Sequence, residues 1–470
     1  MFGVMAEAAA HGAHHVEGWV TGLFAALLVA MVLTLAFEEK IHAKKSMITG
    51  AFAVITLFLG AAFGLLPFGE VTLANGEHVA LPVYIPAIDW GVIAIILGSS
   101  LFVDATSKSG LFTYIAIKLT KASKGDPWLL LMYYGLMTVV FSAVLNNVTA
   151  MIIVGSLTGV SLRKLGRENL LLGFLITEGL LTNIGGLLTL ISSVPNIIVG
   201  QAAKISFMEF FVTASPFVVV ATAVTLWMGA KRFGVKRLET SEEKREALKQ
   251  VQGFDETDGI ESEGFFWFSV AALGLFIVTL ATTSILPFIQ DLGMGYVAMA
   301  FGLTALLRFK SRIDEFLRAI DWDLLFFFAF LFVVIHVMEH AQVLGLIGSA
   351  LEQVIALGDV GGTAVLLTAA AVFSSVTDNI PLAAMLAKAL SNLGTSPDSP
   401  LWWSVVFGAN LGGNITPIGS ASTVVAFTII HKNELDLSFM GFVKVAAPFA
   451  LVQLILATAY VLAHAHLTAP

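Results

Sequence analysis

The chain has 470 residues, of which 57% are hydrophobic and only 12% are charged, and it contains no cysteine. A soluble domain carries about twice that share of charged residues, so the composition is that of a protein that crosses a membrane many times. The lack of cysteine excludes disulfides, thiolate metal sites and cysteine nucleophiles. The net charge of −8 says little about partners, because the position of each charge matters more than the sum.

The first 17 residues form a short tail that contains His11, His14 and His15. These histidines could bind a metal, but a solvated extracytoplasmic tail is the simpler interpretation, and it lacks the pattern of a cleaved signal peptide. Apolar runs that approach the roughly 20 residues of a bilayer crossing then recur along the chain. In an all-α polytopic fold we predict about ten crossings, near residues 18–37, 46–67, 87–107, 168–200, 209–230, 264–288, 293–308, 322–344, 401–430 and 438–465.

Two further apolar segments, 127–162 and 361–393, each break in the middle at a polar pair. The pair is Asn146-Asn147 in the first segment and Asp378-Asn379 in the second. Each segment is long enough for two short helices and too interrupted for one crossing. We therefore predict two re-entrant hairpins, whose non-helical tips must be buried in protein or line a cavity.

The lysine and arginine residues test these predicted crossings. They all lie on one side of the membrane only if each hairpin returns to the side from which it enters. By the positive-inside rule that side is cytoplasmic, and both termini are extracytoplasmic in the cell (inner) membrane. The polar segment 231–263 then becomes a cytoplasmic linker, partly helical, between a first repeat (18–230) and a second (264–470). Topology explains the basic clusters, so we expect the lipid bilayer as a partner and no nucleic acid.

The two hairpins belong to a duplicated unit. Residues 87–90 recur as 319–322, and Phe141-Ser142 recurs as Phe373-Ser374, both at an offset of 232. Each unit holds an odd number of crossings, so the two copies run in opposite directions. Inverted repeats with broken helices that meet at the midplane are the architecture of many secondary transporters.

A second polar element interrupts one crossing in each half. Residues 183–186 and later Pro195-Asn196 interrupt the segment 168–200, and residues 412–417 interrupt 401–430. After a one-residue slip, Asn183 aligns with Asn414. Glycine lets backbones approach and proline frees a carbonyl, although such residues often only kink or pack helices.

Duplication beside the hairpin tips favours a binding site over simple helix packing. The predicted ion- or substrate-binding residues are Ser142, Asn146, Asn147, Thr149, Asn183, Gly185, Gly186, Asn196, Ser374, Asp378, Asn379, Asn414, Thr416 and Ser420. The expected ligands of a bound Na⁺ are the side chains of Asn146, Asn147, Asn183, Asp378, Asn379 and Asn414.

These motifs resemble the arsenite permease/sodium–proton antiporter branch of the ion transporter superfamily, and are also similar to the melanosomal P protein and, more distantly, to dicarboxylate/sodium symporters. The resemblance covers residues 20–465 and implies an elevator-like transport domain on a scaffold that often forms a homodimer. Several relatives have Asp-Asn at the first tip, where this chain has Asn146-Asn147. The motifs are SAVLNNVTAMIIV, TNIGGLLTLISSVPNIIV, SSVTDNIPLAAML and GANLGGNITPIGSASTVV.

Intramembrane ionisable residues are the expected proton carriers. Asp378 could bind Na⁺ or a proton in turn, which would give antiport, although it could also cap the second helix of its hairpin. Asp104 and its repeat partner His336 suit a proton relay or a hydrogen-bond cluster; a metal beside His336 would lack a fourth ligand. Glu178, one turn before Asn183, is a further carrier or a charge near the membrane surface.

No Walker A motif, serine triad or redox motif is present, so we expect no enzyme activity and no cofactor other than bound Na⁺. The sequence favours an ion-coupled secondary transporter, with sodium–proton antiport first. Coupled transport of an anion or oxyacid, such as arsenite, a dicarboxylate or chloride, is the alternative, and a channel comes last. The predicted crossings lack an arginine clamp for an anion, but helix N-termini can replace one.

Overall fold

The computed structural model describes residues 16–66, 70–72, 76–310 and 313–468. The tail histidines lie outside these ranges. The described chain confirms the all-α prediction, apart from a small β-hairpin in which β1 (Glu70–Thr72) pairs antiparallel with β2 (His78–Ala80). The chain folds into two compact units, the first comprising residues up to Asp89 together with Trp322–Ala350, and the second comprising the remainder.

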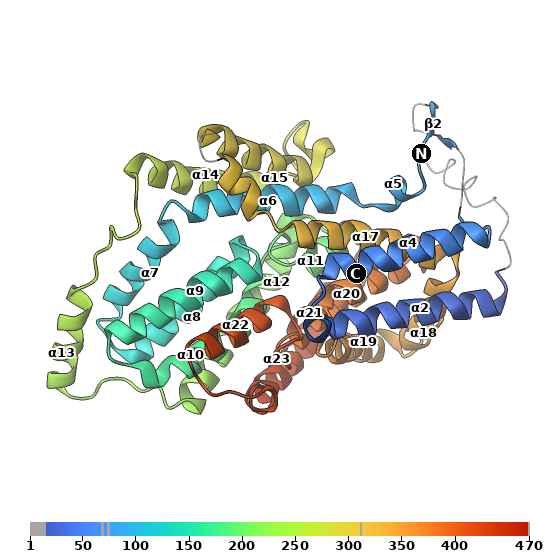
Figure 1. Cartoon of the computed structure of the whole chain (residues 1–470). Coiled ribbons are helices and arrows are strands. Elements are labelled where there is room, and N and C mark those ends of the chain that lie inside the picture. Colours follow the sequence, from blue (N-terminus) through green and yellow to red (C-terminus); the bar gives the residue numbers. More distant parts are fainter. Residues whose placement is uncertain (1–15, 67–69, 73–75, 311–312, 469–470) are drawn as a thin grey trace. The chain divides into compact units, whose positions relative to one another are not determined.

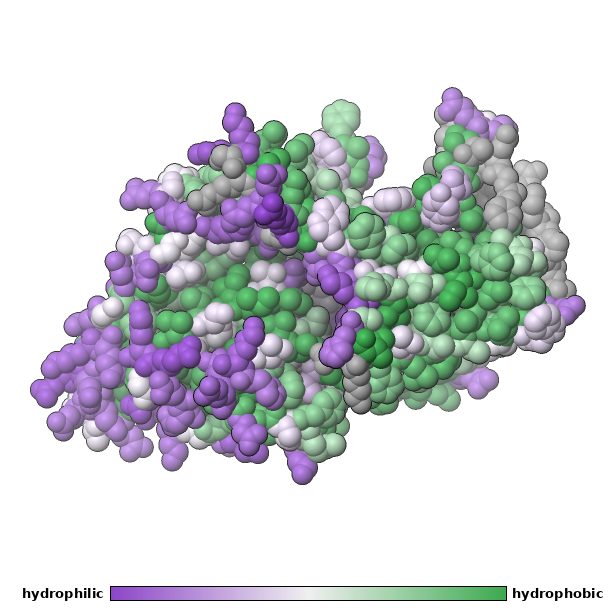
Figure 2. Space-filling view, in the orientation of Figure 1, coloured by the Kyte–Doolittle hydropathy of each residue, from purple (hydrophilic) through white to green (hydrophobic). Residues whose placement is uncertain are grey.

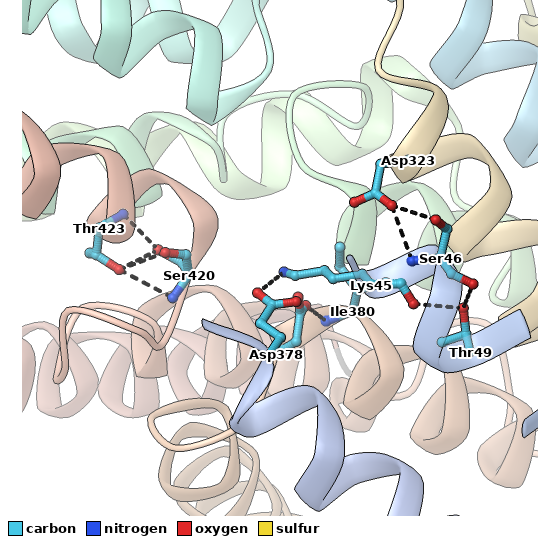
Figure 3. A network of polar contacts seen from close by, with 9 residues as sticks. Lys45, Ser46, Thr49, Asp323, Asp378, Ile380, Ser420 and Thr423 are labelled. Atoms are coloured by element: carbon cyan, nitrogen blue, oxygen red, sulfur yellow. Dashed lines mark hydrogen bonds and ion pairs between the residues drawn. The ribbon is translucent and has the colours of Figure 1, made fainter. Parts of the chain in front are cut away.

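The first unit is built on three long helices. Helix α4 (Lys45–Ala62) packs on α2 (Gly18–Ala36) and along α17 (Trp322–His340). Ser46 donates to Asp323 Oδ1 from its backbone N–H (3.2 Å) and its hydroxyl (2.5 Å), which joins the starts of α4 and α17 (Figure 3). The smaller helices of this part are α3 (Glu38–Ile41), α5 (Tyr84–Ala87) and the first half of α18 (Val343–Ile355).

Outside the two hairpins, the described part of the second unit contains five long helices, of which α15 is interrupted near its start. They are labelled in Figure 1. Helix α6 packs along α15, where the Phe102 ring lies 5.5 Å from that of Phe301. The Phe102 ring also lies 4.7 Å from that of Phe276, on α14. Helix α15 bends at Gly293, whose φ of 75° is one that favours glycine. The bounds of the five are α6 (Trp90–Ser107), α12 (Phe207–Arg232), α14 (Glu263–Thr282), α15 (Ile289–Arg308) and α23 (Phe439–Thr468).

Pairs of helices form the two predicted hairpins and the two interrupted crossings of the second unit. The hairpin helices are α8 (Pro127–Val144), α9 (Asn147–Lys164), α19 (Gly358–Ser374) and α20 (Asn379–Asn392). The broken helices are α10 (Leu171–Gly185, preceded by a 3₁₀ turn, Glu168–Leu170) with α11 (Val194–Ala202), and α21 (Pro400–Gly412) with α22 (Ala421–Lys432). Each hairpin helix that follows a tip starts at the polar pair, because Asn146 and Asp378 are N-caps.

One detail of the first broken helix was predicted wrongly. Pro195-Asn196 does not interrupt a helix but opens α11, and the break lies before it, at residues 186–193. Proline is favoured in the first turn of a helix, where its missing N–H has no helical partner to lose.

Two amphipathic helices were missed. Helix α7 (Leu111–Ala122) buries Phe112 and Ile117 while Lys118 and Lys121 stay on its polar side, and α18 follows α17 as α7 follows α6. Both are too short and too mixed in composition to register as crossings. The remaining short helices are α13 (Ser241–Gln252) and α16 (Ile313–Ala319).

Nine helices of the described residues are long and apolar enough to cross a membrane. They include α8, the first arm of a hairpin, whereas the pieces of the broken helices are too short to be counted singly. The protein is therefore a polytopic membrane protein. The side on which its termini lie stays a prediction.

The two halves of the sequence pack reciprocally on each other. Helix α4 packs on α17 and α15 packs on α6, so the second long helix of each half lies on the third of the other. Likewise α9 and α10 contact α22, while α20 and α21 contact α11. Such reciprocity is expected of two copies related by a two-fold operation.

The linker 231–263 is fastened to the second unit. Glu256 accepts from Lys121 (3.1 Å) and pairs closely with Lys118, and the Asp126 carboxylate accepts from the Leu238 N–H (3.0 Å). The Lys164 ammonium lies 4.8 Å from the centre of the Phe254 ring. The hydrophilic surface of this linker and α13 is visible in Figure 2.

The contact between Glu256 and α7 should depend on pH. The two lysine ammonium groups lower the pKa of the Glu256 carboxyl below its usual 4.5. A lowered pKa stabilises the contact above pH 4.5, and that stabilisation is lost as pH falls through the lowered value. We expect Glu256→Gln to raise amide hydrogen exchange around residues 253–262 at pH 7, whereas Glu246→Gln, on the exposed face of α13, should not; equal rates in both variants would contradict this.

Candidate functional site

The end of α10 and the start of α22 meet at one buried amide. Asn183 donates from Nδ2 to Asn414 Oδ1 (2.8 Å) and to Ser420 Oγ (2.9 Å). Its Oδ1 accepts from Ser422 Oγ (3.0 Å) and from Asn147 Nδ2 (3.4 Å). Asn183 therefore joins the first hairpin tip to both broken helices.

A second buried amide, that of Asn410, makes the equivalent connection from the second broken helix to the first. Asn410, in the last turn of α21, accepts at Oδ1 from Ser193 Oγ (2.7 Å) and donates to Asn196 Oδ1 (2.9 Å). Ser193 is the N-cap of α11, as Ser420 is the N-cap of α22. We call Asn183–Ser420 and Asn410–Ser193 the crossing pairs, because each joins the end of one broken helix to the middle of the other.

The hydrogen bonds between hairpin and broken helix are the same in both halves, and they show which residues of the two repeats are equivalent. Ser142 donates to the Thr182 carbonyl (2.6 Å), and its counterpart Ser374 donates to that of Ala409 (2.5 Å). The hydroxyls of Thr189 and Thr416 likewise donate to the carbonyls of Ala143 and Ser375, each at 2.5 Å. For both kinds of bond, equivalent hairpin residues of the two halves are 232 positions apart in the sequence, and equivalent broken-helix residues are 227 positions apart.

The predicted equivalence of Asn183 and Asn414 is therefore wrong, and the true counterpart of Asn183 is Asn410. The predicted slip matched the letters Asn-Ile, but the second half is shorter between hairpin and broken helix than that slip allows. Asn410 was missed although the sequence held a signal for it, because Asn183 and Asn410 each stand two residues before a pair of glycines, Gly185-Gly186 and Gly412-Gly413.

Asn414 has a different task. Its Nδ2 donates to Gln453 Oε1 on α23 (2.8 Å) and to the Leu180 carbonyl (3.2 Å). Gln453 in turn donates to Thr225 Oγ1 on α12 (3.0 Å). This series of hydrogen bonds ties the crossing pairs to the long helices, and neither Gln453 nor Thr225 was predicted.

The two asparagines at the first hairpin tip have separate roles. Asn146 caps α9 by accepting from the Thr149 N–H (2.8 Å), so Thr149 contributes its backbone. Asn147 accepts from Ser142 Oγ (2.7 Å) and faces Asn183. A Cβ atom on Gly186 would lie 2.5 Å from Asn147 Oδ1, so a larger residue there would displace the Asn147 side chain.

The second tip is capped by a carboxylate. Asp378 Oδ1 accepts from the Ile380 N–H (2.9 Å), which is the capping role considered from the sequence (Figure 3). Asn379 is buried as the first residue of α20. The hydroxyl of Ser420 contacts that of Thr423 (3.0 Å) in addition to Asn183.

The break between α10 and α11 is held by its own side chains. Asn196 Nδ2 donates to the carbonyls of Gly186 (2.6 Å) and Thr189 (3.0 Å), and Ser192 donates to the same two carbonyls. Gly185 lies against the hairpin, where an added Cβ would meet the Val139 carbonyl oxygen at 2.6 Å. These bonds satisfy carbonyls that the broken helix leaves free.

Comparison with known proteins identifies the family. The sequence model described as citrate transporter matches residues 29–408, which is most of the chain. The chain belongs to the citrate transporter family. It is a membrane transporter, and the superfamily resemblance drawn from its motifs is confirmed.

Relatives of this citrate transporter family member span most of its length. An uncharacterised transporter of Mycobacterium bovis is 29% identical over 79% of this chain and 86% of its own. The 46 kDa membrane protein of Mycobacterium leprae is 26% identical over 90% of this chain and 94% of its own. The P protein of Sus scrofa is 26% identical over 95% of this chain, which matches 60% of that protein.

Two solved structures share the fold of this citrate transporter family member. The YdaH transporter of Alcanivorax borkumensis gives a TM-score of 0.60 at 14% identity, over 89% of this chain and 97% of that one. MtrF of Neisseria gonorrhoeae gives 0.56 at 14% identity, over 89% and 94%. Identities this low show the fold alone.

The predicted proton carriers of this citrate transporter family member lie in different surroundings. Glu178 is fully buried in α10, where Oε1 accepts from Thr158 Oγ1 (2.7 Å) and Oε2 has no hydrogen-bond partner among the described residues. Asp104 lies half-buried in the second unit. His336 lies in the first, with its ring 4.5 Å from that of His340. The described residues contain no cluster of three acidic or histidine ligands for a metal.

Proposed function

We propose that this secondary transporter carries a small carboxylate anion, coupled to Na⁺ or protons, and that the anion binds at the crossing pairs. The proposal reverses the order favoured by the sequence, in which sodium–proton antiport came first. It is supported by the family, whose description names citrate, and by the chemistry of the crossing pairs.

The observation that carries the proposal is that the N-termini of three helices lie at the amide and hydroxyl side chains of the crossing pairs. Helices α11 and α22 both begin at a crossing serine, and α9 begins at the tip that contacts Asn183. The helix dipole makes such starts favourable for anions. The crossing pairs themselves are amides and hydroxyls, which can bind carboxylate oxygens without a charged clamp.

Coupling to a cation fits the second hairpin tip. Asp378 offers a carboxylate at the start of α20, and the amides of Asn147, Asn183 and Asn379 supply neutral oxygens of the kind that bind Na⁺. Bound Na⁺ would offset the charge of the anion, and its release would empty the site. Sodium–proton antiport remains the second candidate, favoured by this one carboxylate.

The experiment measures both functions in one preparation. Purified protein in liposomes that contain a pH-sensitive dye is given radiolabelled citrate with an inward Na⁺ gradient, an inward proton gradient or no gradient. Gradient-driven citrate uptake is the expected result. Dye response to Na⁺ with no citrate uptake would overturn the proposal in favour of antiport.

Two substitutions at Asp378 should separate its charge from its cap. Asp378→Asn keeps a capping oxygen for the Ile380 N–H, so we expect normal stability and loss of gradient-driven uptake. Asp378→Ala also loses the cap, which costs about 0.5–2 kcal/mol. Uptake and thermal unfolding of both variants check this, and full coupled uptake in Asp378→Asn would exclude the carboxylate from coupling.

A further inference from the structure

A groove lies between α9, the second helix of the first hairpin, and α22, the second helix of the second broken crossing. None of the residues of the crossing pairs lines it. It has a volume of about 450 Å³ and is lined by one face of each helix. The lining residues are Ile152, Gly155, Ser156, Gly159, Val160 and Arg163 of α9, with Val425, Thr428, Ile429, Lys432 and Asn433. This volume lies within the range of small-molecule sites.

The groove follows α9 and α22 toward the ends of both helices. Its inner end, at Ile152 and Val425, lies about one turn beyond the starts of α9 and α22. Those starts carry Asn147 and Ser422, which both bond Asn183. Its outer end, at Arg163 and Lys432, is about 16 Å further along α9.

Glycines keep the groove open along α9. A Cβ on Gly155 would lie 2.8 Å from Ile429 Cδ1, and one on Gly159 would lie 3.3 Å from Arg163 Nη2. Arg163 can therefore fold back over Gly159 and donate from Nη1 to Asn433 Oδ1 (3.0 Å), which holds its guanidinium across the mouth.

The charge of the mouth has one sign. Both charged residues that line the groove, Arg163 and Lys432, are cations, and both are exposed. Such a mouth attracts anions and repels Na⁺, and a pair of cations at a cleft raises the local concentration of an anionic substrate. The lining between the mouth and the inner end is otherwise apolar or hydroxylic.

We propose that this groove is the path by which the anion reaches the crossing pairs, with Arg163 and Lys432 as the residues that select its charge. The inference rests on the proposed function, because it takes the transported species to be an anion. An anionic lipid headgroup would suit the same cations, and the test includes that outcome.

The natural lack of cysteine makes the test direct, since a single introduced thiol is the only one present. Ser156→Cys and Thr428→Cys place thiols in the groove, and Ser241→Cys places one on the exposed start of α13 as control. Each variant is treated in liposomes with a negatively charged sulfonatoethyl or a positively charged trimethylammonioethyl methanethiosulfonate. We expect the ratio of negative to positive reaction rates to be about tenfold higher in the groove than at the control.

Neutralising the mouth should remove this preference. With Arg163→Gln and Lys432→Gln added, the groove ratio should fall to that of the control, while citrate uptake shows a raised KM and unchanged kcat. Lys249→Gln, an exposed cation on α13, should change neither. Equal ratios of negative to positive reaction rates in the groove and at the control would overturn the inference. A lipophilic maleimide is applied as a third reagent, and reaction of the groove thiols with this reagent alone would also overturn the inference, because it would indicate a bound lipid.

The two proposals fail in different ways. Charge-selective labelling without any carboxylate uptake would contradict the proposed function and leave an anion-selective groove. Uptake without charge-selective labelling would contradict the groove and leave the proposed function.

Discussion

Asn183→Ala is expected to lower kcat/KM for anion uptake by about 100-fold, which corresponds to about 2.7 kcal/mol. Asn183 connects Asn147, Asn414, Ser420 and Ser422, and its loss leaves several buried polar groups unpaired. Each such group costs about 1–3 kcal/mol when no water replaces the lost bond. The loss should appear in uptake by liposomes that contain equal amounts of folded protein.

Asn410→Ala tests whether both crossing pairs take part. It removes the partner of Ser193 and Asn196, so a loss of similar size is expected. Asn392→Ala, at the exposed end of α20, is the matched control and should leave uptake unchanged. Normal uptake in Asn183→Ala or Asn410→Ala would show that the crossing pairs only pack the helices.

Gly412→Ala is expected to destabilise the fold by about 1–3 kcal/mol or more, as overpacking does in a tight core. The new Cβ would lie 2.3 Å from the Ala371 carbonyl oxygen and 2.7 Å from the Ala371 Cα, so backbone would have to move. Gly185 makes the equivalent approach to Val139 in the first half. Thermal unfolding in detergent measures the effect, together with the yield of folded protein.

Gly274→Ala is the control for this substitution. Gly274 lies in α14 with nothing within 4 Å of an added Cβ, so alanine should be neutral or stabilising there, by up to about 1 kcal/mol. An unfolding temperature of Gly412→Ala equal to that of the wild type would mean that α19 and α21 do not approach as closely as the structure has them.

The hairpin tips were predictable from the sequence because a polar pair is costly within an apolar run unless it ends one helix and starts the next. Asn146 and Asp378 cap the helices that follow, and a cap residue marks a helix start in the sequence itself. The register of the broken helices was harder to predict. Asn414 and Asn183 share a neighbouring isoleucine, but hydrogen bonds to the hairpins pair Asn183 with Asn410 instead.

Features made by distant segments carried no local signal. The groove joins α9 to α22, which are far apart in the chain, and neither helix is unusual alone. Gln453 is a single polar residue in a long apolar helix, and its importance comes from its hydrogen bond to Asn414. The homodimer implied by the resemblance and the Na⁺ expected at the polar side chains stay predictions.

Citrate binding by purified protein is the measurement that tests the central claim most directly. Titration calorimetry in detergent, with Na⁺ present, compares the wild type with Asn183→Ala and Asn392→Ala. We predict that the wild type and Asn392→Ala bind citrate, while Asn183→Ala binds about 100-fold more weakly or not at all. Equal affinity in all three proteins would contradict an anion site at the crossing pairs.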